Sequence, residues 1–120
     1  MQNFALREFE ETSLIFKEGL LGDAAYILKE GRVRISTRAN GEKIVLAELT
    51  PLTIFGEMAL LTGNQVRTAT AEAISRVKVI EIDRAKFDGL MAQSPSIIVT
   101  ILHAITKRLV DITSRLYKPH

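Results

Sequence analysis

The chain has 120 residues, a length that suits one domain and leaves little room for a second. Its composition, 47% hydrophobic and 25% charged with a net charge of +2, excludes a disordered chain and a strongly basic nucleic-acid binder. It has no cysteine, which excludes disulfides and thiol catalysis, and no stretch approaches the roughly 18 apolar residues of a membrane span. We therefore expect a cytoplasmic globular domain with no membrane partner, which by itself binds no nucleic acid.

Alternating apolar residues, punctuated by glycines, predict short β-strands over the first three quarters of the chain. The alternating positions are Leu6, Leu14, Phe16, Tyr26, Leu28, Val33, Ile35, Val45, Ala47 and Leu49. Two further strands are predicted at 68–74 and 77–82. Asn40-Gly41 predicts a tight hairpin, because both residues tolerate a positive φ. Many short strands separated by turns are typical of a β-sandwich or a barrel.

After residue 82 the composition changes, and two helices are predicted. Residues 83–91 are expected to form a short helix with Asp83 as its N-cap. A longer helix follows, with Ser94 expected at its N-cap and Pro95 in its first turn. We therefore predict one domain over residues 1–120, with a β-barrel over about 4–82 and helices over about 83–118.

The longer helix carries an apolar stripe whose members are spaced alternately by four and three residues. The stripe consists of Ile98, Leu102, Ile105, Leu109, Ile112 and Leu116. This spacing is narrower than a usual core-facing stripe, and Ile97, Ile101 and Val110 lie off it, in positions to face the barrel instead. Two interpretations stand: the helix covers its own barrel, or it pairs in parallel with a second copy. We favour a homodimer through the stripe.

The segment from 55 to 71 concentrates the residues with binding chemistry. Gly56 opens a short apolar turn next to the carboxylate of Glu57, and Arg67 follows further along. A turn opening into a helix presents backbone N–H groups that bind anions, and an arginine adds a charge-assisted contact to a phosphate. An acceptor-only carboxylate suits hydroxyl groups such as those of a ribose. Alone, Arg67 is also explained as a solvated surface residue and Glu57 as an acid favoured by the helix dipole, but together they indicate a ligand.

Residues with catalytic chemistry are scarce in this sequence. The histidines are His103 and His120, there is no cysteine, and no spacing is typical of metal ligands. Hydrolysis of a nucleotide needs a metal or a general base near Arg67, and the sequence offers neither there. His103 is expected to face solvent or a neighbour from the middle of its helix. We predict that the chain is not an enzyme and that it holds no metal and no cofactor.

The run Phe55-Gly56-Glu57-Met58-Ala59-Leu60-Leu61, followed by Arg67-Thr68-Ala69-Thr70-Ala71, resembles the phosphate-binding cassette of the cyclic nucleotide-binding domain family. Upstream, residues 15–19, 22–28 and 31–35 look like the family's early strands, and the two helices look like its B and C helices. The resemblance covers nearly the whole chain. It implies an α+β, mainly β fold: a double-stranded β-helix (jelly-roll) barrel with a short cassette helix and C-terminal B and C helices. The chain resembles the sensor domain of catabolite-activator-type bacterial regulators without the DNA-binding domain.

The resemblance also implies roles for the residues of the cassette. Gly56 would let the backbone approach the ligand, Glu57 would bind the ribose 2′-hydroxyl, and Arg67 would bind the cyclic phosphate. Backbone N–H groups around Met58 and Ala59 would also reach the phosphate.

Four further contacts are implied outside this group. The hydroxyl of Thr68 would meet the phosphate or a purine in the syn form, and Ile35 and Leu46 would form apolar walls near the base. Thr113 would lie near the base, in part across the dimer, although a solvent-facing helical threonine is the simpler explanation. The sequence departs from the family at Val66, where many members have proline, and this predicts a looser start to the loop.

These roles imply a regulatory module for a cyclic nucleotide, with cAMP favoured over cGMP, that signals when the cassette and the C-terminal helix close over the ligand. The alternative is a structural or dimerisation domain that keeps the fold but not the ligand. Val66 and the missing output domain favour that alternative, whereas Glu57 and Arg67 oppose it, because a scaffold needs neither residue. The preferred purine, the output partner and whether the chain is a stand-alone sensor or a fragment are left open.

Overall fold

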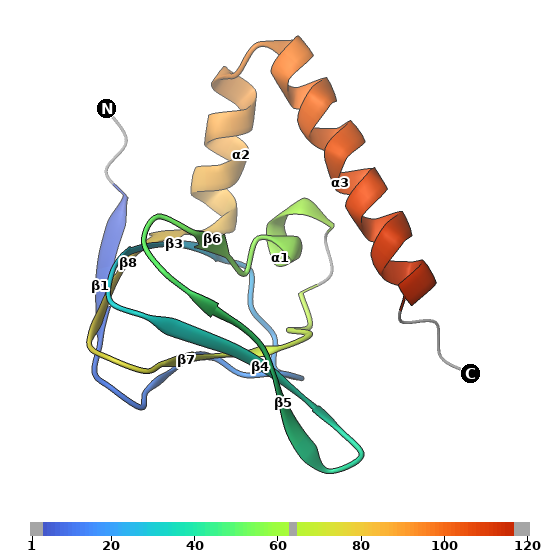
Figure 1. Cartoon of the computed structure of the whole chain (residues 1–120). Helices are drawn as coiled ribbons and strands as arrows, with labels where there is room; N and C mark the ends of the chain where they lie inside the picture. The colour runs from blue at the N-terminus through green and yellow to red at the C-terminus, as the bar shows by residue number, and fades with distance from the viewer. Residues whose placement is uncertain (1–3, 63–64, 117–120) are drawn as a thin grey trace.

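The computed structural model describes residues 4–62 and 65–116, with side chains described through residue 108. Two four-stranded antiparallel sheets are followed by two long helices (Figure 1). The strands are β1 (Ala5–Phe9), β2 (Leu14–Phe16), β3 (Ala25–Glu30), β4 (Val33–Ala39), β5 (Glu42–Leu49), β6 (Ile54–Phe55), β7 (Thr70–Ala73) and β8 (Val77–Ile82). The helices are α1 (Met58–Leu61), α2 (Arg84–Gln93) and α3 (Ser96–Leu116). This arrangement confirms the prediction of a mainly β domain with a short cassette helix and two helices after the strands.

Strands that are far apart in the sequence pair in both sheets. One sheet has the order β1-β8-β3-β6 and the other β2-β7-β4-β5. The first strand therefore pairs with the last, and the second with the one before it, so the chain closes on itself. Such crossing between two sheets is typical of a jelly roll. It places α1, which follows β6, beside β3.

The apolar core lies between the two sheets. Its largest fully buried side chains are Leu28, Val33, Val77 and Val79. In β2, Ile15 belongs to the core and is 8% exposed, whereas Leu14 is 48% exposed. The alternation that predicted an inward-facing Leu14 is therefore wrong. A register shift between Leu14 and Phe16 is the reason, because it turns the neighbouring side chains of Ile15 and Phe16 both toward the core.

The hairpin between β4 and β5 turns where it was predicted. Asn40 and Gly41 have φ values of 53° and 79°, the positive pair that this kind of tight turn requires. Further along, the register shifts between Ile35 and Ser36 and leaves Leu46 as an extra residue on β5. The alternation predicted through β5 is therefore interrupted, and half of the Val45 surface, 51%, is exposed on this edge strand.

The ends of the two long helices confirm one capping prediction and correct the other. Asp83 is the N-cap of α2, and its carboxylate accepts a first-turn amide at 2.9 Å. Ser94 is not the N-cap of α3, because its hydroxyl donates back to the carbonyl of Leu90 at 2.8 Å and it ends α2. The carbonyl of Pro95 instead accepts two amides of the first turn of α3, at 3.0 and 3.2 Å.

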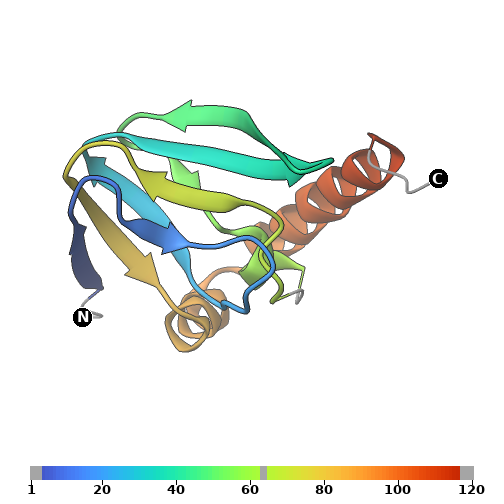
Figure 2. The same cartoon turned by 90° about the horizontal axis from the view of Figure 1, so that it is seen from below.

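Helix α3 runs away from α2 and projects beyond the sheets (Figures 1 and 2). Leu102, which is partly buried, and Thr106, which is 7% exposed, mark the face that points toward the domain. Four isoleucines on other sides are 52–65% exposed, namely Ile97, Ile98, Ile101 and Ile105. The expectation that Ile97 and Ile101 face the barrel is therefore wrong. Within the stripe, Leu102 is partly buried, whereas Ile98 and Ile105 are exposed. The side chains of Leu109, Val110, Ile112 and Leu116 lie outside the described residues.

None of the helices in the described ranges is both long enough and apolar enough to span a membrane.

Candidate ligand-binding site

The cassette is built around α1, a single helical turn that begins just after β6. Gly56, with a φ of +73°, turns the chain out of the strand in a conformation that other residues rarely adopt. A side chain there would also crowd its surroundings, because a Cβ would lie 3.0 Å from Phe16 and 3.1 Å from Nη1 of Arg67. Ala59 and Leu60, each 4% exposed, anchor the turn in the core. The chain thus needs both a glycine and apolar anchors to present this turn.

The groups predicted to meet a ligand at α1 are not used by other described residues. The amides of Met58 and Ala59 donate no backbone hydrogen bond within the described chain, as is usual in the first turn of a helix. The carboxylate of Glu57 makes no capping hydrogen bond. It also forms no ion pair with any residue in the ranges that the structure describes. Two amide donors and one carboxylate are therefore available at this turn.

Arg67 lies beneath the cassette and is only 6% exposed. Its Nη1 donates to the carbonyl of Gly56 at 2.9 Å, and its Nη2 donates to the carbonyl of Ala24 at 2.7 Å. The guanidinium carbon lies 4.2 Å from the ring centre of Phe16. The buried Nε has no hydrogen-bond partner. Because a guanidinium has five N–H donors, two carbonyls fix its plane and leave donors for another acceptor.

The charge environment of Arg67, like its remaining N–H donors, favours an anionic partner. Burial lowers the pKa of the Arg67 guanidinium below its usual value, while Tyr26 and Asp23 act in the opposite direction. No carboxylate of the described residues forms an ion pair with it. A buried cation without a counter-ion is costly, so this arrangement is suited to an anion that arrives with a ligand.

Backbone pairing fixes the segment that carries Arg67. Leu21 and Val66 form an antiparallel bridge, and amides on either side of it donate across to carbonyls at 2.8 and 2.9 Å. The carbonyl of Arg67 also accepts the amide of Gly19 at 2.8 Å. At residues 65–67 backbone hydrogen bonds, rather than a proline ring, therefore hold the segment, and the looser start of the loop stays a prediction.

The sequence interpretation missed the residues that surround the guanidinium. A Cβ on Gly22 would lie 2.6 Å from Nε and 2.9 Å from Nη2 of Arg67, so only glycine allows this close approach. Phe16 lies under the guanidinium, and Ala24 supplies a carbonyl. A usable signal was the run of small residues at 22–25, which interrupts the apolar alternation ahead of β3.

The remaining predicted contacts are spread over other elements. Ile35 is half-buried on β4 and packs against the core, and Leu46 is the bulged residue of β5, 50% exposed. Thr68 is exposed directly after Arg67. The side chain of Thr113 lies outside the described residues. The structure thus joins the cassette to Arg67 directly, whereas Ile35 and Leu46 come from the hairpin of the other sheet.

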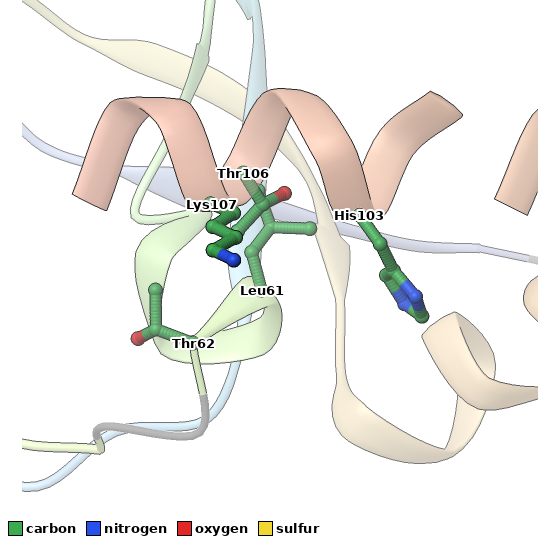
Figure 3. Close-up of a pocket in the computed structure, with 5 residues that line it drawn as sticks. All are labelled: Leu61, Thr62, His103, Thr106 and Lys107. Carbon is green, nitrogen blue, oxygen red and sulfur yellow. The ribbon is translucent and has the colours of Figure 1, made fainter. Parts of the chain in front are cut away.

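A cavity lies beside α1 and another lies over the other sheet, and neither is lined by Glu57 or Arg67. One, of about 310 Å³, separates α1 from α3 and is lined by Leu61, Thr62, His103, Thr106 and Lys107 (Figure 3). His103 thus points toward a neighbouring element from an exposed position. The other, of about 410 Å³, lies over the sheet β2-β7-β4-β5 and has polar walls that include Ser36, Lys43 and Thr70.

Comparison with protein families gives one match that covers most of the chain. The model of the family described as "Cyclic nucleotide-binding domain" matches residues 6–94. The CRP-like cAMP-activated global transcriptional regulator of Mycobacterium tuberculosis is 31% identical over 103 residues, which are 85% of this chain and 46% of the regulator. The chain therefore spans about half the length of the curated bacterial relatives it matches.

Solved structures show the same architecture. The catabolite activator protein of Thermus thermophilus matches with a TM-score of 0.77 and 29% identity, over 94% of this chain and 53% of that chain. The EAL enzyme Bd1971 in its cGMP-bound form matches with a TM-score of 0.76 and 31% identity, over 92% of this chain and 30% of that chain. These likenesses confirm the predicted fold class, a mainly β jelly roll that ends in helices.

Proposed function

This chain belongs to the cyclic nucleotide-binding domain family, and on that premise we propose that it is a regulatory module whose cassette binds a cyclic nucleotide. The family is regulatory rather than catalytic, and we assign no reaction to this chain. The observation that carries the proposal is Arg67, a buried cation with an unpaired Nε and no acidic partner among the described residues.

A cyclic phosphate suits the donors around Arg67. It carries a single negative charge, which would balance a guanidinium that burial otherwise penalises. The carbonyls of Ala24 and Gly56 already hold the guanidinium plane, so the ligand meets an arginine that is positioned before it arrives. The free amides of Met58 and Ala59 would donate to the same phosphate.

The sugar and the base would extend from this anchor. Glu57, whose carboxylate makes no cap, would accept the ribose 2′-hydroxyl. Thr68 would contact the phosphate or a syn purine, and Ile35 and Leu46 would pack near the base. Thr113 would reach the base from α3, in part from the second copy.

We propose cAMP as the preferred ligand and cGMP as the weaker one. The mycobacterial relative is described as cAMP-activated, which supports this order, and the EAL enzyme is solved with cGMP bound, which keeps cGMP as a candidate. No cofactor is part of the proposal.

Signalling would proceed by closure of the cassette and α3 over the nucleotide, within a homodimer paired through α3. The exposed isoleucines of α3, Ile98 and Ile105 among them, support the dimer, because apolar side chains in a row are stabilised when a partner covers them. A cytoplasmic location completes the proposal and agrees with a chain that has no cysteine.

Calorimetric titration of the chain with cAMP and cGMP tests this function, with 5′-AMP as the matched control that lacks the cyclic phosphate. We expect heat of binding with cAMP, a weaker response with cGMP and none with 5′-AMP. No heat with either cyclic nucleotide up to millimolar concentration would reject ligand binding. A dimer whose light scattering is the same with and without nucleotide would then favour a ligand-free dimerisation domain.

A further inference from the structure

Arg84 is the first residue of α2, but its side chain bonds to a different helix. Its Nη2 donates to the carbonyl of Ala59 at 2.8 Å, and its Nη1 donates to the carbonyl of Leu60 at 3.0 Å. Both carbonyls belong to α1, the single turn that runs from Met58 to Leu61. The guanidinium therefore satisfies the carbonyl end of the cassette helix, whose opposite end carries the free amides.

The position of Arg84 is unfavourable for its own helix. A cation in the first turn of α2 opposes the helix dipole, and only the N-cap Asp83 offsets it locally. The nearest acid on α2, Asp88, stands 3.9 Å away and is well exposed, so that pair adds little. The same cation at the carbonyl end of α1 is favourable and makes two charge-assisted hydrogen bonds. The arginine therefore serves the contact between the two helices rather than α2 alone.

The contact of α1 with α3 is different in kind. A cavity of about 310 Å³ separates them, with Leu61 and Thr62 on one side and Thr106 and Lys107 on the other (Figure 3). Packing across an open cavity leaves α3 room to approach or withdraw. The hydrogen bonds of Arg84, in contrast, tie α1 directly to the start of α2, which Asp83 caps.

We propose that Arg84 is a positioning residue that couples the cassette to α2 and, through it, to α3. This inference rests on the proposed binding of a cyclic nucleotide at α1. A ligand that draws α1 inward pulls on the carbonyls of Ala59 and Leu60, and the guanidinium passes that displacement to α2. Without Arg84 the cassette still binds the ligand, but the helices respond less.

The absence of native cysteine makes the movement of α3 measurable. Lys29→Cys on β3 and Ala104→Cys on α3, both at exposed positions, carry nitroxide labels whose separation is measured by pulsed electron paramagnetic resonance with and without cAMP. The same pair is placed in the Arg84→Gln and Arg84→Lys variants. Arg76→Gln is the matched control, because Arg76, in the turn between β7 and β8, also makes a charge-assisted bond, to Glu8 on β1, and its ion pairs are with Glu8 and Glu10 rather than with α1 or α2.

With Arg84→Gln we expect saturating cAMP to shift the label separation by less than half of the shift in the parent. The affinity for cAMP, measured by calorimetry, stays within about fivefold of the parent, the lower end of allosteric couplings. Arg84→Lys, which keeps the charge but not the forked donor pair, gives an intermediate shift, and Arg76→Gln matches the parent. A full shift with Arg84→Gln overturns the proposal, and so does a more than tenfold loss of affinity, since Arg84 would then act on the site itself.

A measurement without ligand separates this inference from the proposed function. Hydrogen exchange in the peptide that covers residues 58–62 is expected to quicken in Arg84→Gln and to stay unchanged in Arg76→Gln, in the absence of nucleotide. Exchange at the parent rate overturns the link between Arg84 and α1. If the parent binds neither cAMP nor cGMP, the proposed function fails, while faster exchange in Arg84→Gln still supports the link.

Discussion

The surroundings of Arg67 and helix α3 differ in how completely their side chains are packed. Around Arg67 the structure is tight: the guanidinium is 6% exposed, rests on Phe16 and is held by two carbonyls. On α3, four isoleucines are more than half exposed, and a cavity separates the helix from α1. The first region is fixed by its own domain, whereas the part of α3 with described side chains leaves these four isoleucines uncovered.

This difference indicates that the two regions have different roles, one in ligand binding and the other in association. A rigid anchor reduces the ordering that a ligand must impose, which favours binding. A helix with few buried apolar contacts has a low local stability, and its position then depends on whatever covers it. Nucleotide binding should therefore be sensitive to changes around Arg67 and tolerant of changes on α3. Association of chains should be sensitive to changes on α3 and tolerant of changes around Arg67.

The largest expected effect is the loss of nucleotide affinity in Arg67→Ala. Removing a buried, hydrogen-bonded charge partner typically costs about 3 kcal/mol, or roughly a hundredfold in affinity. Calorimetry with cAMP measures it, and Arg32→Ala, at an exposed arginine, is the control. If Arg67→Ala binds as tightly as the parent while remaining folded, the anchor has been assigned to the wrong residue.

Changes on α3 should act on association instead. Ile98→Glu combined with Ile105→Glu places charges on the exposed row and is expected to weaken a dimer by about 2 kcal/mol or more, because burial of an isoleucine contributes on this scale. Sedimentation equilibrium measures the change, and Thr100→Glu, at an exposed position off the row, is the control. Unchanged association of the double variant would remove the isoleucines from the interface.

A smaller effect is expected from Gly22→Ala, which tests the packing around the Arg67 guanidinium rather than the guanidinium itself. The added Cβ would lie 2.6 Å from Nε of Arg67, and overpacking of this kind costs about 1 kcal/mol or more. Denaturant unfolding should show the loss, and calorimetry should show weaker cAMP binding, because the guanidinium must shift.

Gly41→Ala is the matched comparison for that variant. Gly41 has a φ of +79° with open space around its Cβ position, so alanine there strains the β4–β5 turn, which makes no hydrogen bond to Arg67. We expect Gly41→Ala to lower stability and leave nucleotide affinity unchanged. Equal affinity in both variants would mean that close packing against Gly22 does not position the arginine.

Features that depend on a few neighbouring residues were determined by the sequence alone. The Asn40-Gly41 turn follows from backbone freedom at two positions, and the cap of α2 follows from one carboxylate at Asp83. The cassette motif is similarly local, because a glycine, a short apolar turn and an arginine stand close together in the chain. Their residue types were enough to indicate a mainly β domain and the place of its candidate site.

Contacts between distant parts of the chain were decided only by the tertiary structure. Gly22 and Phe16 enclose Arg67 because β2 and the segment before β3 fold against the end of the cassette. The small residues at 22–25 mark a break in the alternation, but they do not identify the residue that approaches there. The bulge at Leu46 and the register shift after Leu14 turn side chains to faces that simple alternation misplaces. Arg84 is the clearest case. In the sequence it is the first residue of α2, whereas in the fold its guanidinium binds two carbonyls of α1. Those carbonyls belong to residues 24 and 25 positions earlier in the chain.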